Sequence, residues 1–302
     1  MVTTLRIHKV EPDSFRHRIL ARPSSYVPPI LWKPEILDDI DCDVLPNISK
    51  DKSNYTTNPT TKDSHVGYTP TPLSILARNC RRDETSRQLF GSTIHSYRSV
   101  LKSSGYSTPH LYLDGKSVAP TTPHYLYRST TTSRPILAYV DKNWLWSKRN
   151  HFNCRRRLSS VALKIAHGIS ESMTKLDFDP YIACLLISMA QDSCSFTSDD
   201  EIPVHVFSPS TDKKSFTQHS SNISRQYLQK WEKSYEFSSC RLTITRKTLT
   251  LNQLYIFLEE FREKEKSNAC SSEALVSSKK RKVKSDMTDG ADKSSTVKRV
   301  RH

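Results

Sequence analysis

The stretch Asp179-Pro-Tyr-Ile-Ala-Cys-Leu-Leu-Ile-Ser-Met-Ala190 is the part of the sequence that indicates most clearly how the chain folds. Aspartate is a favoured helix N-cap and proline fits the first turn of a helix, so Asp179-Pro180 predicts a helix start. The residues that follow are apolar or small on every side of that helix. A helix without a polar face is predicted to lie inside a domain.

A second helix is predicted directly before the first. Its apolar residues recur at i, i+3, i+4, i+7, i+8, i+11 and i+15, namely Leu158, Val161, Ala162, Ile165, Ala166, Ile169 and Met173. This spacing forms one continuous apolar stripe on a helix surface. We therefore expect an amphipathic helix that packs on one face.

Strands and further helices are predicted on both sides of this pair. Pro135-Ile-Leu-Ala-Tyr-Val140 indicates a buried strand, followed by a turn that carries Trp144 and Trp146. Beyond the helices, the sequence predicts strands at 202–207, 215–219 and 241–246, a short helix at 224–233 and a last helix capped by Thr250.

The predicted order from residue 135 is β-α-α-β-β-α-β-α. It describes a globular α/β or α+β module over residues 135–266, with a small mixed sheet and packed helices.

The remaining residues are predicted to be less regular. Residues 1–45 form an extended, proline-rich segment, because proline restricts itself and the residue before it. Residues 46–72 have few large apolar side chains and predict a disordered loop. Residues 73–134 form a poorly defined region of an irregular N-terminal half, and residues 267–302 a disordered basic tail.

Two local patterns stand out within residues 73–134. Leu73, Leu76 and Ala77 recur at helical spacing and predict a helix over residues 73–87. A strand that includes Leu111 to Leu113 is predicted to end in a tight turn at Asp114-Gly115.

Three segments of the predicted module resemble a family of uncharacterised proteins from filamentous fungi. They are Arg155-Arg-Arg-Leu-Ser-Ser-Val-Ala-Leu-Lys164, Asp179-Pro-Tyr-Ile-Ala-Cys184 and Ile202-Pro-Val-His-Val-Phe207. The resemblance covers roughly residues 135–260. Because the function of that family is unknown, the resemblance implies no activity.

The chain is strongly basic over its whole length. Its 302 residues include 46 Lys and Arg against 31 Asp and Glu, for a net charge of +15. Residues 267–302 contain nine of these basic and four of these acidic residues, which leaves 37 and 27 elsewhere, a net +10. Such an excess favours an anionic partner such as nucleic acid or an acidic protein, although many basic surfaces bind nothing specific.

The tail contains the most specific motif of the chain. Lys279-Lys-Arg-Lys-Val-Lys284 resembles a monopartite nuclear import signal, and a second basic cluster lies 13 residues beyond it, near the spacing of two-part signals. The residues are Lys279, Lys280, Arg281, Lys282, Val283, Lys284, Lys298, Arg299 and Arg301. The resemblance implies a nuclear import adaptor as partner and a nuclear localisation. The alternative is a solubilising tail or a nonspecific nucleic-acid arm.

Three consecutive arginines precede the predicted amphipathic helix. Arg155, Arg156 and Arg157 are candidates for contact with an anion such as phosphate, or for recognition by a kinase that modifies Ser159 or Ser160. The simpler interpretation is a solvated first helical turn.

No complete catalytic, metal or cofactor motif is found. His151-x-x-Cys154 is half of a zinc site, and Asp212-Lys213-Lys214 lacks the second acidic residue that a metal-dependent phosphodiesterase needs. The chain has six glycines and no phosphate-binding glycine loop. We therefore expect no cofactor and no metal.

Cysteine spacing and hydropathy indicate the redox compartment of the protein and its relation to membranes. The seven cysteines include no C-x-x-C pair, which favours a reducing compartment over a disulfide framework. The longest apolar run, Tyr181 to Ala190, is about half the length that a membrane span needs. We expect no membrane association.

The sequence supports three hypotheses of function. The leading one is a nuclear protein without catalytic activity, whose module binds another nuclear protein. The second is a nucleic-acid-binding protein that uses its basic surface. The third is an enzyme with an unrecognised site.

Overall fold

The computed structural model describes residues 9–22, 27–48, 82–105, 108–155, 160–210 and 215–267. The chain divides into two compact units, Met1–Leu258 and Glu259–His302. The first unit contains the sheet and all the sites considered below. The predicted tail and its import signal lie outside the described residues, apart from the first residue of the tail.

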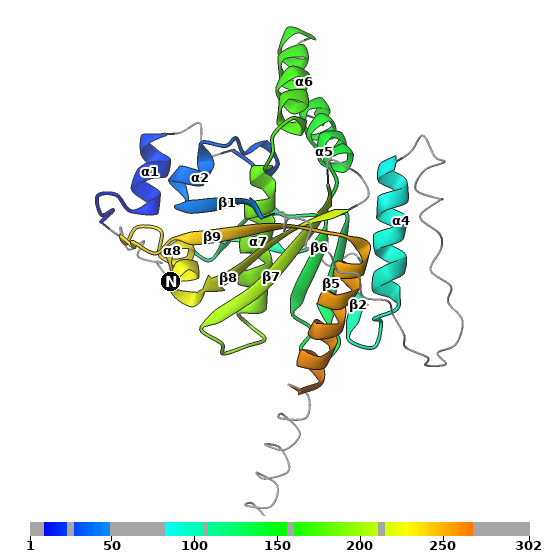
Figure 1. Cartoon of the computed structure of the whole chain (residues 1–302). Coiled ribbons are helices and arrows are strands. Elements are labelled where there is room, and N and C mark those ends of the chain that lie inside the picture. Colours follow the sequence, from blue (N-terminus) through cyan, green and yellow to red (C-terminus); the bar gives the residue numbers. More distant parts are fainter. Residues whose placement is uncertain are drawn as a thin grey trace, which may run out of the picture. The chain divides into compact units, whose positions relative to one another are not determined.

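A seven-stranded mixed sheet forms the centre of the first unit (Figure 1). Its strands run in the order β1-β9-β8-β7-β6-β5-β2, and neighbours are antiparallel except for the β1–β9 and β6–β7 pairs. The strands are β1 (Cys42–Ile48), β2 (Leu101–Ser103), β5 (Tyr125–Ser129), β6 (Pro135–Tyr139), β7 (Glu201–Pro209), β8 (Phe216–Ser224) and β9 (Leu242–Leu249). The predicted mixed α/β class is confirmed.

Helix α7 (Pro180–Ser193) is the buried helix that the sequence predicts. The Asp179 carboxylate caps it by accepting a 3.0 Å hydrogen bond from the Tyr181 amide. Residues 180–190 are all buried, because α7 packs on one face of the sheet, where it contacts β6, β7 and β8, and is covered on its other sides by the N-terminal segment, residues 110–113 and residues 225–232.

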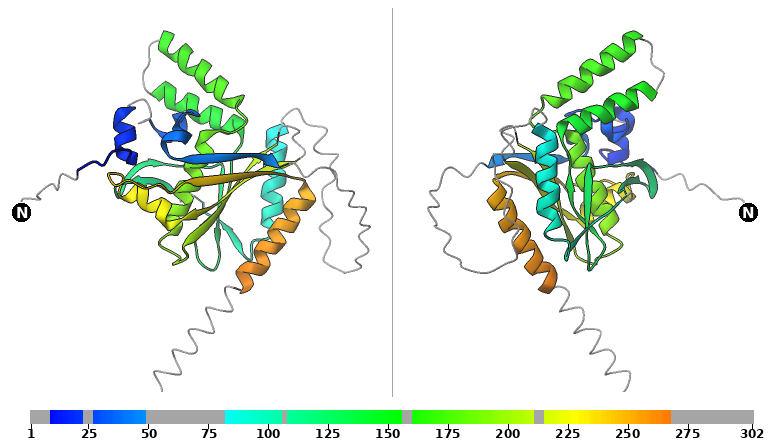
Figure 2. Two further views of the ribbon diagram at one scale, coloured as in Figure 1. Left: turned by 60° about the vertical axis from the view of Figure 1, so that its left-hand side comes forward. Right: turned by 90° about the vertical axis from the view of Figure 1, so that its right-hand side faces the viewer.

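The opposite face of the sheet is covered by α4 (Arg82–His95) and by residues 251–258 of the last helix (Figures 1 and 2). Phe90 of α4 stacks on Tyr139 at 4.7 Å between ring centroids and lies 5.4 Å from Phe207. The last helix begins with a capping box, in which the Gln253 amide donates to Thr250 Oγ1 at 3.3 Å and the Thr250 amide donates to Gln253 Oε1 at 2.9 Å.

A small two-stranded sheet lies beside α7. It consists of β3 (His110–Leu113) and β4 (Lys116–Pro120), joined by Asp114 and Gly115 with φ of 51° and 71°. Positive φ at both central residues is what a tight hairpin turn requires, and glycine adopts it at no steric cost. The predicted turn at Asp114-Gly115 is confirmed.

Helices α5 (Lys142–Arg155) and α6 (Ser160–Thr174) form a hairpin that projects from the sheet (Figures 1 and 2). The predicted turn around Trp144 and Trp146 is wrong, because both residues lie in α5. Helix α5 escaped prediction because its buried face is largely polar and shows no apolar period. Its buried residues are Leu145, Arg149, Asn150 and Asn153.

The N-terminal segment is more regular than its sequence predicts. Instead of one extended segment over residues 1–45, it contains three short helical elements before β1. They are α1 (Phe15–Ala21), the 3-10 helix η2 (Pro29–Leu31) and α2 (Ile36–Asp39). Proline is compatible with the first turn of a helix, which is why Pro29 begins η2.

Three predicted boundaries also change. Strands β1, β2 and β5 precede residue 135 and belong to the same sheet as β6, so the sheet is not confined to residues 135–266. Strand β1 runs into the predicted loop 46–72, of which residues 49–72 lie outside the described residues. The helix predicted at 73–87 is α4, which begins at Arg82, and residues 73–81 are not described.

Candidate functional site

An apolar groove of about 800 Å³ lies between the N-terminal helices and the β3–β4 hairpin. Phe15 of α1 and Trp32 line one side, and Leu113 and Val118 of the hairpin line the other. Trp231 of α8 (Arg225–Glu232) also lines it. These segments are far apart in the chain, so the groove exists only in the folded protein.

Three aromatic rings form the floor of the apolar groove. Phe15 meets Trp231 edge to face at 4.6 Å between ring centroids, and Trp32 is stacked on Trp231 at 6.4 Å. Each ring is at most 5% exposed. The Trp32 indole N–H donates to the Val27 carbonyl at 3.2 Å, which fixes the ring orientation.

The rim of the apolar groove exposes large apolar side chains. Leu20 of α1 is 63% exposed, and Val118 of β4 is 40% exposed. Among the described strands, β4 pairs with β3 alone, so one edge of β4 is open to another extended segment. An unpaired strand edge beside an apolar surface is a common site for the addition of a peptide strand.

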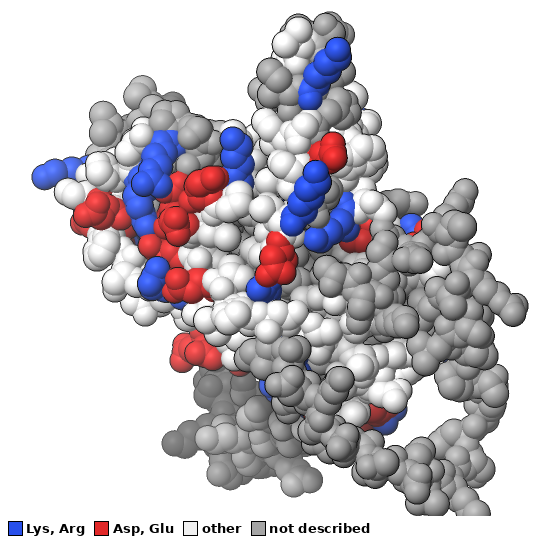
Figure 3. Space-filling model, turned by 45° about the horizontal axis from the view of Figure 1, so that its top comes forward, with Lys and Arg blue, Asp and Glu red and all other residues white. Residues whose placement is uncertain are grey.

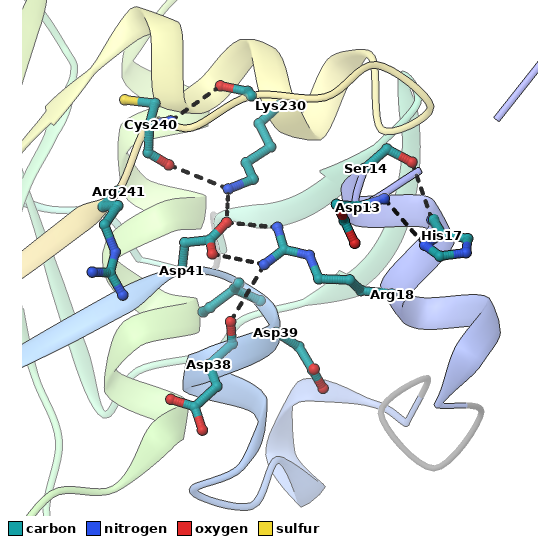
Figure 4. Close-up of polar contacts among 12 residues, drawn as sticks. Asp13, Ser14, His17, Arg18, Asp38, Asp39, Asp41, Lys230, Cys240 and Arg241 are labelled. Atoms are coloured by element: carbon teal, nitrogen blue, oxygen red, sulfur yellow. Dashed lines mark hydrogen bonds and ion pairs between the residues drawn. The ribbon is translucent and has the colours of Figure 1, made fainter. Parts of the chain in front are cut away.

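Asp41 joins the N-terminal side of the groove to α8 (Figure 4). Its two carboxylate oxygens accept hydrogen bonds of 2.6 Å each from the Arg18 guanidinium, and it also accepts one from the Lys230 ammonium. Lys230 donates in addition to the Cys240 carbonyl at 3.2 Å, and its side chain is 1% exposed. We call Arg18, Asp41 and Lys230 the Asp41 cluster.

Burial and charge act against each other in the Asp41 cluster. Burial on its own raises the pKa of Asp41, but the hydrogen bonds and charges of Arg18 and Lys230 outweigh it and lower that pKa. Burial, together with the charge of Arg18, lowers the pKa of Lys230 more than its contacts with Asp41 raise it. The carboxylate is thus the shared partner that both cations require.

The hairpin side of the groove is anchored to the same part of the chain. Asp114 accepts hydrogen bonds from the Ser234 amide at 3.0 Å and from the Ser234 hydroxyl at 2.9 Å. It also pairs with Arg16 at 3.0 Å, and its own amide donates to the Trp231 carbonyl at 2.8 Å. Both sides of the apolar groove are therefore fixed to α8 and the residues after it.

A second polar cluster connects α4 to α5. Arg87 lies 2.9 Å from His124 Nε2, and Asp141 Oδ2 lies 3.0 Å from Nδ1. Because arginine only donates, Nε2 accepts and Nδ1–H donates to the carboxylate. Both ring nitrogens of His124 are therefore hydrogen-bonded within the fold.

A third cluster surrounds His219 on β8. Its Nε2 lies 3.1 Å from Ser208 Oγ, and Arg246 beside it pairs with Asp177 at 2.6 Å. Burial and the charge of Arg246 lower the pKa of His219 to about 3. A neutral, buried imidazole of this kind stabilises the fold and cannot act as a base near neutral pH.

The residues singled out in the sequence do not converge on one site. Arg155 is exposed at the end of α5, and Arg156 and Arg157 lie outside the described residues. His151 and Cys154 are exposed on α5, and no group of three metal-ligating side chains is found in the described part of the chain. Asp212-Lys213-Lys214 falls between the described ranges.

The apolar groove was not predicted. Trp32 packs in the core. No spacing rule links Trp32 to Phe15 and Trp231.

Comparison with known protein families, with curated proteins and with solved structures gives no match. Within the described residues, no helix combines the length and the apolar character that crossing a bilayer takes.

Asp41→Asn should lower the free energy of unfolding by about 2–4 kcal/mol, because it leaves Lys230 buried without a counter-charge. Urea unfolding followed by tryptophan fluorescence measures the loss. The control is Asp43→Asn. Asp43 pairs with Arg241 at 3.3 Å and the Arg241 side chain is mostly exposed, so this variant should lose less than about 1 kcal/mol. Equal losses in the two variants would show that the Asp41 cluster adds nothing beyond a surface ion pair.

The lowered pKa of His219 predicts that the folded chain loses stability in mild acid. Its pKa is about 3 in the folded chain and about 6.5 in the unfolded chain. Between these values only the unfolded chain binds the proton, so stability is complete above about pH 6.5 and falls as the pH decreases.

From pH 6.5 to 4.5 this loss amounts to about 2 kcal/mol in the native chain, and His219→Gln should lack it. Urea unfolding at the two pH values measures the difference, with His95→Gln at an exposed position as the control. Identical pH dependence in the native chain and in His219→Gln would contradict the assignment.

Proposed function

We propose that this chain is a nuclear protein without catalytic activity, which binds an extended apolar segment of another nuclear protein in the apolar groove. The observation that carries the proposal is the groove itself. It has a fixed aromatic floor, exposed apolar side chains on its rim and an open strand edge along one side.

The groove suits an extended peptide better than a small reacting molecule. Alternate side chains of a peptide strand added to β4 would point to one face, where Leu20 and Val118 offer apolar contact. Each buried aliphatic anchor contributes about 1.5–3 kcal/mol, so two anchors supply about 3–6 of the roughly 8 kcal/mol that micromolar binding needs.

Several polar groups of the groove are committed to the fold. Arg16 and Asp114 pair with each other, and Ser117 is hydrogen-bonded to His110 at 2.8 Å. The other polar clusters described above also lack a free acid, base or nucleophile at a cavity. Within the described residues, the enzyme hypothesis therefore has no supporting site.

Surface charge gives little support to the nucleic-acid hypothesis on the face shown in Figure 3. Among the described residues visible there, basic and acidic side chains are interspersed and form no single basic patch. Some basic side chains of the described residues are also paired with acids, for example Arg18 with Asp41 and Arg22 with Asp39. Nucleic acid binds most strongly to surfaces that concentrate positive charge.

The groove is tested with peptides selected from a random phage-displayed library on the native chain. A selected peptide should bind Val118→Asp at least about tenfold more weakly, because the carboxylate would be placed against apolar side chains. Fluorescence polarisation of the labelled peptide measures the dissociation constants. Ile256→Asp is the control, since Ile256 is exposed and lies outside the groove.

Two outcomes would sink the groove proposal. One is a library that yields no peptide. The other is a set of peptides whose affinity is the same for the native chain and for Val118→Asp. Partners that are recovered from nuclei but lost after nuclease treatment would support the nucleic-acid hypothesis instead.

Nuclear import is tested separately with a fluorescent fusion too large to diffuse through nuclear pores. Replacement of Lys280, Arg281 and Lys282 by alanine should abolish nuclear accumulation, because these side chains supply the positive charge of the proposed signal. Replacement of Lys298, Arg299 and Arg301 should reduce it if the signal has two parts. Lys293→Ala is the matched control, and a native fusion excluded from nuclei would refute the nuclear assignment.

A further inference from the structure

Helix α6 has a wider apolar surface than the fold uses. Its contact with the rest of the described residues is made chiefly with α5, where the Asn153 amide donates to Ser170 Oγ at 3.3 Å and Met173 is buried. On the other side of the same apolar stripe, Val161 is 67% exposed and Ile169 is 42% exposed. The predicted stripe is therefore only partly covered.

Gly168 lies on this exposed side and has no role in the fold of one copy. A Cβ built on Gly168 meets no heavy atom within 4 Å, and its backbone is helical without a positive φ. Glycine destabilises the interior of a helix relative to alanine, so a packing reason is expected for it. Close approach of another backbone is the reason that fits an open surface.

The exposed side of α6 is complementary to itself in an antiparallel arrangement. With a two-fold axis between residues 166 and 167, Val161 of one copy faces Ser172 of the other, and Gly168 faces position 165. On one flank, Ala162 faces Ile169. A large residue thus meets a small one in the Val161–Ser172 and Ala162–Ile169 pairs, which is the pattern of closely packed helices.

The charges follow the same symmetry. On the second flank, Lys164 of one copy faces Glu171 of the other, and the two-fold axis repeats the pair. Both side chains are exposed in the single chain, where Glu171 also pairs with Lys175 at 3.5 Å. In a parallel arrangement, a residue on one flank of a helix faces the other flank of its partner. Lys164 and Glu171 lie on the same flank, so they would not meet.

We propose that α6 is a homodimer interface, in which the α6 helices of two copies pack antiparallel with Gly168 close to the crossing point. The interface is isologous, so it closes at two copies and leaves no free binding surface of the same kind. One helix per copy buries less area than a standard protein–protein interface. The dimer should therefore be weak, with a micromolar dissociation constant.

Sedimentation equilibrium of the full, nuclease-treated chain tests this proposal over about 1–100 µM, the range in which a micromolar dimer dissociates. The native chain should show a monomer–dimer equilibrium. Lys164→Glu and Glu171→Lys should each raise the dissociation constant at least about tenfold, because each variant places two like-charged pairs across the interface. The double variant, Lys164→Glu with Glu171→Lys, should restore the native value to within about threefold.

Two controls separate the interface from general effects of charge and helix stability. Arg98→Glu makes the same change of net charge as Lys164→Glu, at an exposed position after α4, and should leave the equilibrium unchanged. Gly168→Ala and Gly91→Ala both improve helix propensity at positions where a Cβ has free space, yet only Gly168→Ala should weaken the dimer. Circular dichroism confirms that each variant is folded.

A native chain that is monomeric over the whole range would overturn the proposal. It would also be overturned by a dimer that neither single charge variant weakens, or by a double variant that remains as weak as the single ones.

Discussion

The apolar groove depends on one carboxylate. Asp41 lies at the end of the N-terminal segment, where its φ of 52° turns the chain into β1, and it accepts hydrogen bonds from α1 and from α8. Helix α8 supplies the Trp231 floor, and α1 supplies Phe15 and Leu20. The Tyr227 hydroxyl adds a 2.8 Å hydrogen bond to the Ile40 carbonyl beside this carboxylate. These contacts add to the packing of Phe15, Trp32 and Ile36 in the core, and together they hold short helices that would be unstable in isolation.

The sequence predicted the elements whose stability is local and left out those that depend on distant partners. Helix α7 was predicted from its cap and its apolar run, and the β3–β4 turn from Asp114-Gly115. Helix α5 was not predicted, because its buried face is built from Arg149, Asn150 and Asn153. Arg149 is buried because it donates to the Ile30 carbonyl at 2.8 Å and pairs with Asp179 at 2.7 Å. No local sequence pattern indicates either contact.

The same limit applies to the candidate site. Asp41 and Lys230 are separated by 189 positions in the chain, so no motif relates them. The groove combines three segments whose residues each resemble ordinary core or surface. The amphipathic stripe of α6 was predicted correctly as a helix surface. Only the structure shows that part of this stripe lies uncovered on a projecting hairpin.

The groove and the α6 surface support a coherent proposal for how the protein works. A weak homodimer would present two grooves, and a partner with two suitable segments would bind with an avidity above that of either groove alone. The proposed import signal would bring this binding module to its partners in the nucleus. None of these steps requires chemistry at the described polar clusters.

Amide hydrogen exchange of the native chain and of Asp41→Asn tests most directly whether this carboxylate maintains the groove. The predicted result is faster exchange confined to residues 9–40, while β6, β7, β8 and α7 keep their protection. Unchanged protection of residues 9–40 in Asp41→Asn would contradict the claim, as would an equal loss of protection across the whole sheet.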